Sequence, residues 1–166
     1  MTILTAVDGE TTPSRPVEKG AELSAAFGVD HVALHVMPQD VFEDFRSAAG
    51  GSSPRTVATP VPYGSEEVKP HERVEEYTID DGERHARGVA RDVVTATLDD
   101  PSDVTVEGRV GEPVEEILAE ADRRGARYLV IGGRKRTPVG KAVFGSNTQS
   151  LLLSADQPVV TVMSEG

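Results

Sequence analysis

The stretch GGRKRTPVGKAVFGSN, residues 132–147, lies between a strand-like run and a helix-like run of the sequence. Residues 127–133 read RYLVIGG, an apolar run that favours a strand, and residues 146–155 follow with a helical pattern. A strand that leads through a glycine-rich loop into a helix is typical of phosphate sites, because the first N–H groups of a helix lack backbone partners and attract anions. We therefore expect an anion site here, with a solvated surface turn as the alternative.

The charge of this stretch differs from that of the whole chain. The chain has 28 Asp and Glu against 17 Lys and Arg, a formal net charge of −11, yet no acidic residue lies between Gly132 and Ser146. Gly145 would let the backbone approach an anion closely, and Ser146 would supply an N-cap oxygen and a hydroxyl. The spacing does not match a Walker loop, whose lysine is followed by Ser or Thr. The basic residues are Arg134, Lys135, Arg136 and Lys141.

Strand-like and helix-like runs alternate along the chain, which predicts an α/β fold with a parallel sheet and one domain over residues 1–166. Strands are expected at 2–7, 31–37, 103–110, 127–133 and 157–163, and helices at 15–28, 41–47, about 80–97, 112–125 and 146–155, with Asp80 or Asp81 capping the third helix. Residues 41–79 contain four prolines and are expected to form an irregular excursion after a short helix. Ligands bind beyond the carboxyl ends of such strands, so Asp8 and Gly132-Gly133 would face one site if the first and fourth strands are neighbours.

Composition narrows the function classes. The acidic balance argues against a nucleic-acid partner, which would require a basic footprint. The chain has no cysteine, so thiolate metal sites and disulfides are excluded. No apolar run is long enough for a membrane span, and the N-terminus lacks a signal-peptide pattern, so a soluble, cytoplasmic protein is expected. Abundant acid with few lysines resembles proteins from a high-salt cytoplasm, a halophilic composition.

The histidines are the remaining candidates for chemistry. His31 and His35 lie four residues apart on one side of a predicted strand, a spacing that two metal ligands could use. No third ligand has convincing spacing, so packing or hydrogen bonding is the favoured interpretation. His71 and His85 are expected to be solvated.

Several of these segments together resemble the universal stress protein family. Its signature after the fourth strand is Gly, two residues, Gly, nine residues, then Gly-Ser or Gly-Thr, and Gly132, Lys135 and Gly145-Ser146 stand at these positions. The segment ILTAVDG (3–9) is similar to the family's first strand with its terminal aspartate, ALHVM (33–37) to the second strand, and residues 111–133 to the third helix and fourth strand. The resemblance spans nearly the whole chain except residues 41–79.

The resemblance implies a five-stranded parallel sheet in the order 3-2-1-4-5 with helices on both faces, and a site for ATP, with or without Mg²⁺. Asp8 would lie near the ribose or adenine, and Val36 would meet the adenine through its backbone. Glycines and α-helical donors would contact the phosphates. The nucleotide-binding positions would be Asp8, Val36, Gly132, Gly133, Arg134, Lys135, Gly145, Ser146, Asn147 and Thr148.

One residue departs from the signature, because Lys135 replaces its second glycine. A lysine prevents the same close backbone approach but can supply charge to a triphosphate together with Arg134 and Arg136.

The resemblance implies an ATP-binding stress-response or signalling module with at most slow ATP hydrolysis. The alternative is a nucleotide-free interaction protein of the same fold. A third alternative, an adenylating enzyme, ranks last because residues 8–14, DGETTPS, lack the expected Ser-Gly-Gly-x-Asp-Ser loop. Family members pair their last strands, so a homodimer through residues 158–163 is expected.

Overall fold

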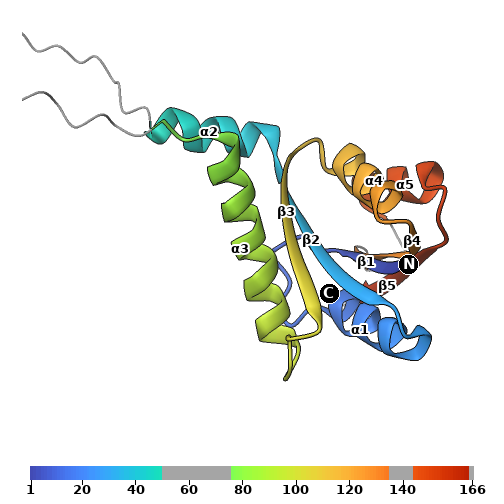
Figure 1. Cartoon of the computed structure of the whole chain (residues 1–166). Helices are drawn as coiled ribbons and strands as arrows, with labels where there is room; N and C mark the ends of the chain where they lie inside the picture. Colours follow the sequence, from blue (N-terminus) through green and yellow to red (C-terminus); the bar gives the residue numbers. More distant parts are fainter. Residues whose placement is uncertain (50–75, 135–143, 165–166) are drawn as a thin grey trace, which may run out of the picture.

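The computed structural model of the chain describes residues 1–49, 76–134 and 144–164. Its centre is a parallel five-stranded sheet in the order β3-β2-β1-β4-β5 (Figure 1). The strands are β1 (Thr2–Ala6), β2 (Asp30–Pro38), β3 (Val104–Gly111), β4 (Ala126–Arg134) and β5 (Val159–Ser164). The predicted α/β class and strand order are confirmed.

Helices cover both faces of this sheet (Figure 1). They are α1 (Arg15–Phe27), α2 (Gln39–Ala49), α3 (Ile79–Thr97), α4 (Pro113–Arg123) and α5 (Ser146–Ser154). One core cluster joins α1 and α3 to the sheet through Val17, Ala90 and Val93. A second cluster joins α4 and α5 to the opposite face through Ile117, Ala121 and Leu151. None of the helices in the described part of the chain is long and apolar enough to cross a membrane.

The central strands are apolar along their length because both of their faces are covered. Ile3 and Leu4 of β1 are fully buried, as are Leu129 and Val130 of β4. The edge strands β3 and β5 are mostly half-buried. The sequence signal was therefore strongest at the centre of the sheet, where the apolar runs are continuous.

The start of α3 differs from the prediction that Asp80 or Asp81 is its N-cap. Thr78 is the N-cap, and its Oγ1 accepts a hydrogen bond from the Asp81 backbone N–H at 3.3 Å. Asp81 returns a bond through its carboxylate, which accepts the Thr78 backbone N–H at 2.9 Å. This reciprocal capping box uses an acid at the third helical position. Thr and Asp are both favoured N-cap residues, so the sequence alone did not show that Thr78 is the N-cap and Asp81 its partner in the capping box.

The predicted excursion at 41–79 is partly helical. α2 extends to Ala49, past the expected end at Ser47, and Phe42 of this helix is buried. The Phe42 ring lies 5.6 Å from the ring of Tyr77, the residue before the α3 cap, so the two ends of the excursion pack together. Residues 50–75 lie outside the described residues.

His31 lies in the core between β2 and α1, and it is hydrogen-bonded as the sequence suggested. It is 2% exposed, and its Nε2 lies 2.9 Å from the Thr5 Oγ1. Its Nδ1 is buried and has no hydrogen-bond partner among the described residues. Burial lowers the pKa of His31 from 6.5 to about 4. The ring packs against Gly20 of α1, where an added Cβ would lie 2.4 Å from Nε2.

Candidate functional site

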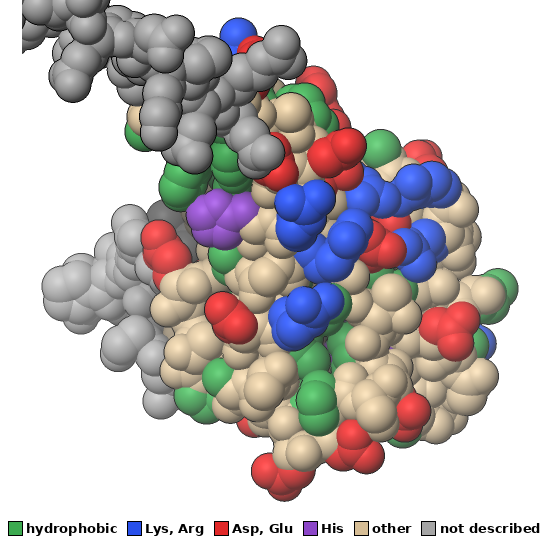
Figure 2. All heavy atoms as spheres, turned by 60° about the vertical axis from the view of Figure 1, so that its left-hand side comes forward, with side chains coloured by type: hydrophobic (Ala, Val, Ile, Leu, Met, Phe, Trp, Pro, Cys, Tyr) green, Lys and Arg blue, Asp and Glu red, His purple; other side chains and the backbone are tan. Residues whose placement is uncertain are grey.

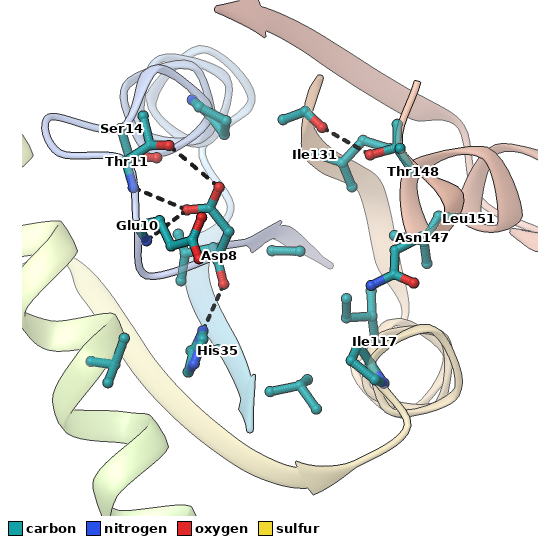
Figure 3. A pocket seen from close by; sticks show the side chains of 18 of the residues that line it. Asp8, Glu10, Thr11, Ser14, His35, Ile117, Ile131, Asn147, Thr148 and Leu151 are labelled. Atoms are coloured by element: carbon teal, nitrogen blue, oxygen red, sulfur yellow. Dashed lines mark hydrogen bonds between the residues drawn. The ribbon is translucent and has the colours of Figure 1, made fainter. Parts of the chain in front are cut away.

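A cavity of about 780 Å³ opens beyond the carboxyl ends of β1, β2 and β4. Its walls come from the loop between β1 and α1, the end of β2, the end of β4 and the start of α5 (Figure 3). This is the position that the topology of a parallel sheet favours, because the chain turns in opposite directions after β1 and β4. Its volume lies within the range of small-molecule sites, roughly 300–1,000 Å³.

Asp8 both shapes the first wall and faces the cavity (Figure 3). Its Oδ1 accepts hydrogen bonds from the backbone N–H groups of Glu10, at 3.0 Å, and Thr11, at 3.2 Å. Gly9 makes this turn possible, since its φ of 77° belongs to the left-handed region and an added Cβ would lie 2.6 Å from the Val89 Cγ1. The carboxylate is thus held by its own turn at the mouth of the cavity.

The opposite wall begins where β4 ends in two glycines. Gly132 lines the cavity, and an added Cβ there would lie 3.3 Å from the Pro16 Cγ at the start of α1. Gly133 also lines the cavity, but its added Cβ would lie 2.6 Å from the Met163 Sδ of β5. Small residues at these two positions therefore leave room between β4, α1 and β5.

The N-terminus of α5 faces the same cavity. Gly145 is its N-cap, so the prediction that Ser146 caps the helix is wrong: Ser146 is the first helical residue. Gly145, Asn147 and Thr148 line the cavity, whereas Ser146 is not among its described lining residues. The N-cap glycine has no side chain, and no side chain among the described residues caps this helix, which suits the binding of an anion by its first backbone N–H groups.

Thr148 joins the two halves of this wall. Its Oγ1 donates a hydrogen bond to the carbonyl oxygen of Gly132 at 3.1 Å (Figure 3). The start of α5 is therefore held against the end of β4, although nine residues between them, 135–143, lie outside the described residues. Lys135 falls in that segment, and the side chain of Arg134 is also outside the description.

Val36 presents backbone groups to the cavity. The carbonyl oxygen of Leu34 accepts a hydrogen bond from the Val7 N–H at 2.9 Å, so Leu34 points its backbone groups toward β1. Alternate residues of a strand direct these groups to the same side, so Val36 points that way too. Since β1 ends at Ala6, the Val36 N–H and C=O lie where the sheet has no further neighbour, and Val36 lines the cavity.

Sequence reasoning did not place several polar lining residues at this site, and Arg15 and His35 are two of them. Arg15 is exposed at the first turn of α1, and its Nη1 donates to the carbonyl oxygen of Met163 at 3.3 Å. The His35 Nδ1 lies 2.8 Å from the Val7 carbonyl oxygen and must donate to it, because a carbonyl only accepts. The neutral ring therefore keeps Nε2 as an acceptor. The proline at position 16 marks a helix start and was the one signal that could have located Arg15.

The remaining wall is apolar. It is formed by side chains of α2, α3, α4 and the segment before α5, among them Val41, Phe45, Val89, Ile117 and Phe144. Among the described residues, no three His, Asp or Glu side chains gather into a possible metal site. The site thus has a polar mouth, a helix N-terminus and an apolar side, which suits an organic anion.

The model of the universal stress protein family matches residues 1–163 of the chain. The chain belongs to the universal stress protein family. A universal stress protein of Mycolicibacterium smegmatis is 46% identical over 55 residues, which are 33% of this chain and 42% of that relative. The local alignment thus covers less than half of that universal stress protein.

Solved universal stress proteins share the fold over nearly the whole chain. The structure from Archaeoglobus fulgidus is 24% identical, covers 97% of both chains and superposes with a TM-score of 0.53. A universal stress protein solved in complex with cAMP is 18% identical, covers 98% of this chain and 96% of that one, and gives a TM-score of 0.51. At these identities the likeness establishes the fold, and the ligand of the second structure is a property of that protein.

Proposed function

We propose that this universal stress protein binds ATP in the cavity between β1 and β4 and acts as a nucleotide-dependent signalling module. The observation that carries the proposal is the meeting of Asp8, Gly132 and the uncapped N-terminus of α5 around one cavity of about 780 Å³. The solved universal stress protein in complex with cAMP lends further support, since cAMP is an adenine nucleotide and that protein shares the fold.

Each part of the nucleotide has a matching wall. The adenine would pair with the outward backbone groups of Val36 beside the apolar wall, and Asp8 would accept from the ribose hydroxyls. The phosphates would lie against the N–H groups of α5, with Asn147 and Thr148 as further donors. Arg15 adds an exposed cation on the α1 side, and Arg134 and Lys135 would add charge from the end of β4. Mg²⁺ would enter with the triphosphate.

Equilibrium dialysis with ATP and Mg²⁺ tests this proposal. We expect saturable binding, a clear loss in Asp8→Ala, and a smaller loss in Thr148→Val, which also removes the hydrogen bond to Gly132. Arg46→Ala is the matched control, because Arg46 is exposed on α2 and does not line the cavity. Absence of wild-type binding at millimolar ATP would refute the proposal.

A nucleotide-free interaction protein of the same fold is the second candidate, and Lys135 is the residue that favours it. If the lysine prevents binding, Lys135→Gly should create ATP affinity where the wild type has none. If the lysine instead supplies charge, the same variant should bind ATP more weakly than the wild type. Adenylating activity is the third candidate, and release of pyrophosphate from ATP during a substrate screen would be its signature.

We also propose a homodimer through the edge strand β5 (Val159–Ser164), which nearly coincides with the expected interface at residues 158–163. Family members often form dimers, and β5 pairs with β4 on one side and with no other strand among the described residues. The Pro158 carbonyl accepts from the Leu129 N–H, so Pro158 directs its backbone groups toward β4. Thr161, an odd number of residues further along the strand, directs its backbone groups to the opposite side, away from β4. Thr161→Pro removes an outward N–H and should give a monomer in sedimentation analysis, whereas Thr161→Val should stay dimeric. A Thr161→Pro dimer as tight as the wild type would exclude this interface.

A further inference from the structure

Arginines gather at the edge of the sheet opposite β5. Figure 2 shows Lys and Arg side chains massed on this side of the molecule around a few acidic ones. We call this surface the arginine face. Its members are Arg87 and Arg91 on α3, Arg109 on β3, and Arg123 and Arg124 at the end of α4, with Glu107 and Glu120 among them.

The two glutamates organise the arginine face. Glu120 is 2% exposed and pairs with Arg123, Arg124 and the Arg109 Nη2, the last at 3.2 Å. Glu107 takes the Arg124 Nη2 at 2.8 Å and lies 3.7 Å from the Arg87 Nη2. Burial acts to raise the pKa of Glu120, but hydrogen bonds from Arg124 and Arg123 and the charge of Arg109 outweigh it and hold the pKa below its ordinary value. Both carboxylates therefore serve to position guanidinium groups.

The arginine face carries more positive charge than its glutamates balance. Five arginines surround two glutamates, an excess of three positive charges, in a chain whose formal net charge is −11. The Arg123 and Arg87 side chains are 57% and 41% exposed. Arg91 is exposed, and it forms no ion pair with any residue that the structure describes. Donors of at least three guanidinium groups thus remain open to solvent.

An apolar groove of about 290 Å³ adjoins the arginine face. It lies between α3 and β3, with Val94, Val104 and Val106 along it. Arg91 and Thr95 border it on α3, and Asp100, Pro101 and Ser102 close its other end, so carboxylates of a bound segment would extend toward the arginines and away from Asp100. Arg91 is one helical turn from Arg87, so the groove continues directly into the arginines. The surface therefore offers a place for an apolar side chain next to a place for carboxylates.

We propose that this surface binds an acidic segment of a partner protein, with one apolar side chain in the groove and its carboxylates on the arginines. Guanidinium groups take carboxylates in bidentate pairs, and a short segment fits a face of this extent. A nucleic acid fits less well, since its regularly spaced phosphates would continue past the arginines onto the surface of a chain whose formal net charge is −11. The β3 edge also lies at the other end of the sheet from β5, so a β5 dimer leaves it accessible.

Fluorescence anisotropy tests the proposal with a labelled peptide of one leucine flanked on each side by three glutamates, added to the full chain in dilute salt. Arg87→Glu with Arg123→Glu should weaken binding by about tenfold or more, since each exposed pair contributes up to about 1 kcal/mol and reversal adds repulsion. Lys19→Glu with Arg46→Glu is the matched control, because it changes the net charge equally on α1 and α2. The control should bind the peptide as the wild type does.

The groove has its own test. Replacing the leucine of the peptide by serine should weaken binding to the wild type severalfold, and Thr95→Glu at the groove rim should have a similar effect on the leucine peptide. Equal loss in the control pair would show that only net charge matters and would overturn the proposal. The proposal would also be overturned if the wild type bound a single-stranded RNA of the same charge as tightly as the peptide. It would likewise be overturned if Arg87→Glu with Arg123→Glu abolished self-association in sedimentation, since a second copy of the chain would then be the occupant. Arg123 pairs with the buried Glu120, so urea unfolding of Arg87→Glu with Arg123→Glu shows whether that variant keeps its fold. Arg87→Glu with Arg91→Glu leaves the Glu120 pairs intact and should weaken binding similarly. The salt dependence of wild-type binding provides an independent check.

Discussion

The buried ring of His31 should make the stability of the protein fall as the pH falls below 6.5. The neutral ring fills a buried site in which the Thr5 Oγ1 lies 2.9 Å from Nε2 and Nδ1 has no partner among the described residues. Protonation would place a charge there and leave an N–H group without an acceptor, which is why burial lowers the pKa to about 4. In the unfolded chain the ring keeps its ordinary value of 6.5 and takes up its proton first.

The size of the effect follows from the two pKa values. The unfolded state binds more protons than the folded state between pH 6.5 and about 4, so the stability present above pH 6.5 is lost progressively through that window. At pH 5 the unfolded ring is almost fully protonated and the folded ring is mostly neutral. The corresponding loss between pH 7.5 and pH 5 is about 2 kcal/mol, because one pKa unit corresponds to about 1.4 kcal/mol.

Urea unfolding of the wild type and of His31→Gln at both pH values isolates this contribution. His31→Gln should be less stable than the wild type at pH 7.5, and the gap should shrink by about 2 kcal/mol at pH 5, since the glutamine does not titrate. Carboxylates such as Glu120 contribute equally to both proteins and cancel. Val17→Ala is the control, because Val17 is also fully buried and its gap should be the same at both pH values. An unchanged gap for His31→Gln would refute the reasoning.

Four further substitutions test how the sequence stabilises the fold, each by urea unfolding. Gly20→Ala should destabilise by about 1–3 kcal/mol, because the new Cβ would lie 2.2 Å from the Thr5 Oγ1; Gly88→Ala, in open space on α3, should instead stabilise by up to about 1 kcal/mol. Gly28→Ala should cost about 1 kcal/mol, since Gly28 ends α1 with a φ of 63° and a Cβ there would meet nothing. Glu120→Gln should cost about 2 kcal/mol at pH 7 and lose less stability than the wild type on acidification, because it removes charged hydrogen bonds and a carboxyl group of lowered pKa. A neutral Gly20→Ala, a stabilising Gly28→Ala or a harmless Glu120→Gln would each contradict the corresponding contact.

The sheet was predictable because its information is local. β1, β2 and β4 are continuous apolar runs, and the pattern of α4, with proline at its start and Gly125 at φ 56° after its end, marks both boundaries. The boundary errors occurred where capping residues compete. Thr78 rather than Asp81 caps α3, and Gly145 rather than Ser146 caps α5. In both cases adjacent residues of suitable type stood in the sequence, and only the backbone geometry selects one.

The candidate site was half predictable for a related reason. Asp8 follows β1, Gly132 lies near the end of β4 and Gly145 precedes α5, and the strand order brings the three to one cavity. Arg15 lines the same cavity because α1 packs beside β4, and His35 lines it because its ring is hydrogen-bonded to the Val7 carbonyl. Both positions depend on contacts between separate elements, which no local sequence pattern encodes. The aromatic contact between Phe42 and Tyr77 is similar, since it joins residues on either side of the excursion.

The arrangement of the edge strands has a consequence for assembly. β3 and β5 terminate the sheet at opposite ends, one bordered by guanidinium groups and the other by open backbone amides. A two-fold pair joined at β5 would carry its two cationic surfaces at the outermost ends of a continuous ten-stranded sheet, twice the five strands of one chain. A partner protein with two acidic segments, joined by a linker long enough to span the dimer, could bind both cationic surfaces at once. The second binding event would then be intramolecular, so the two weak contacts together would give a higher overall affinity than either alone.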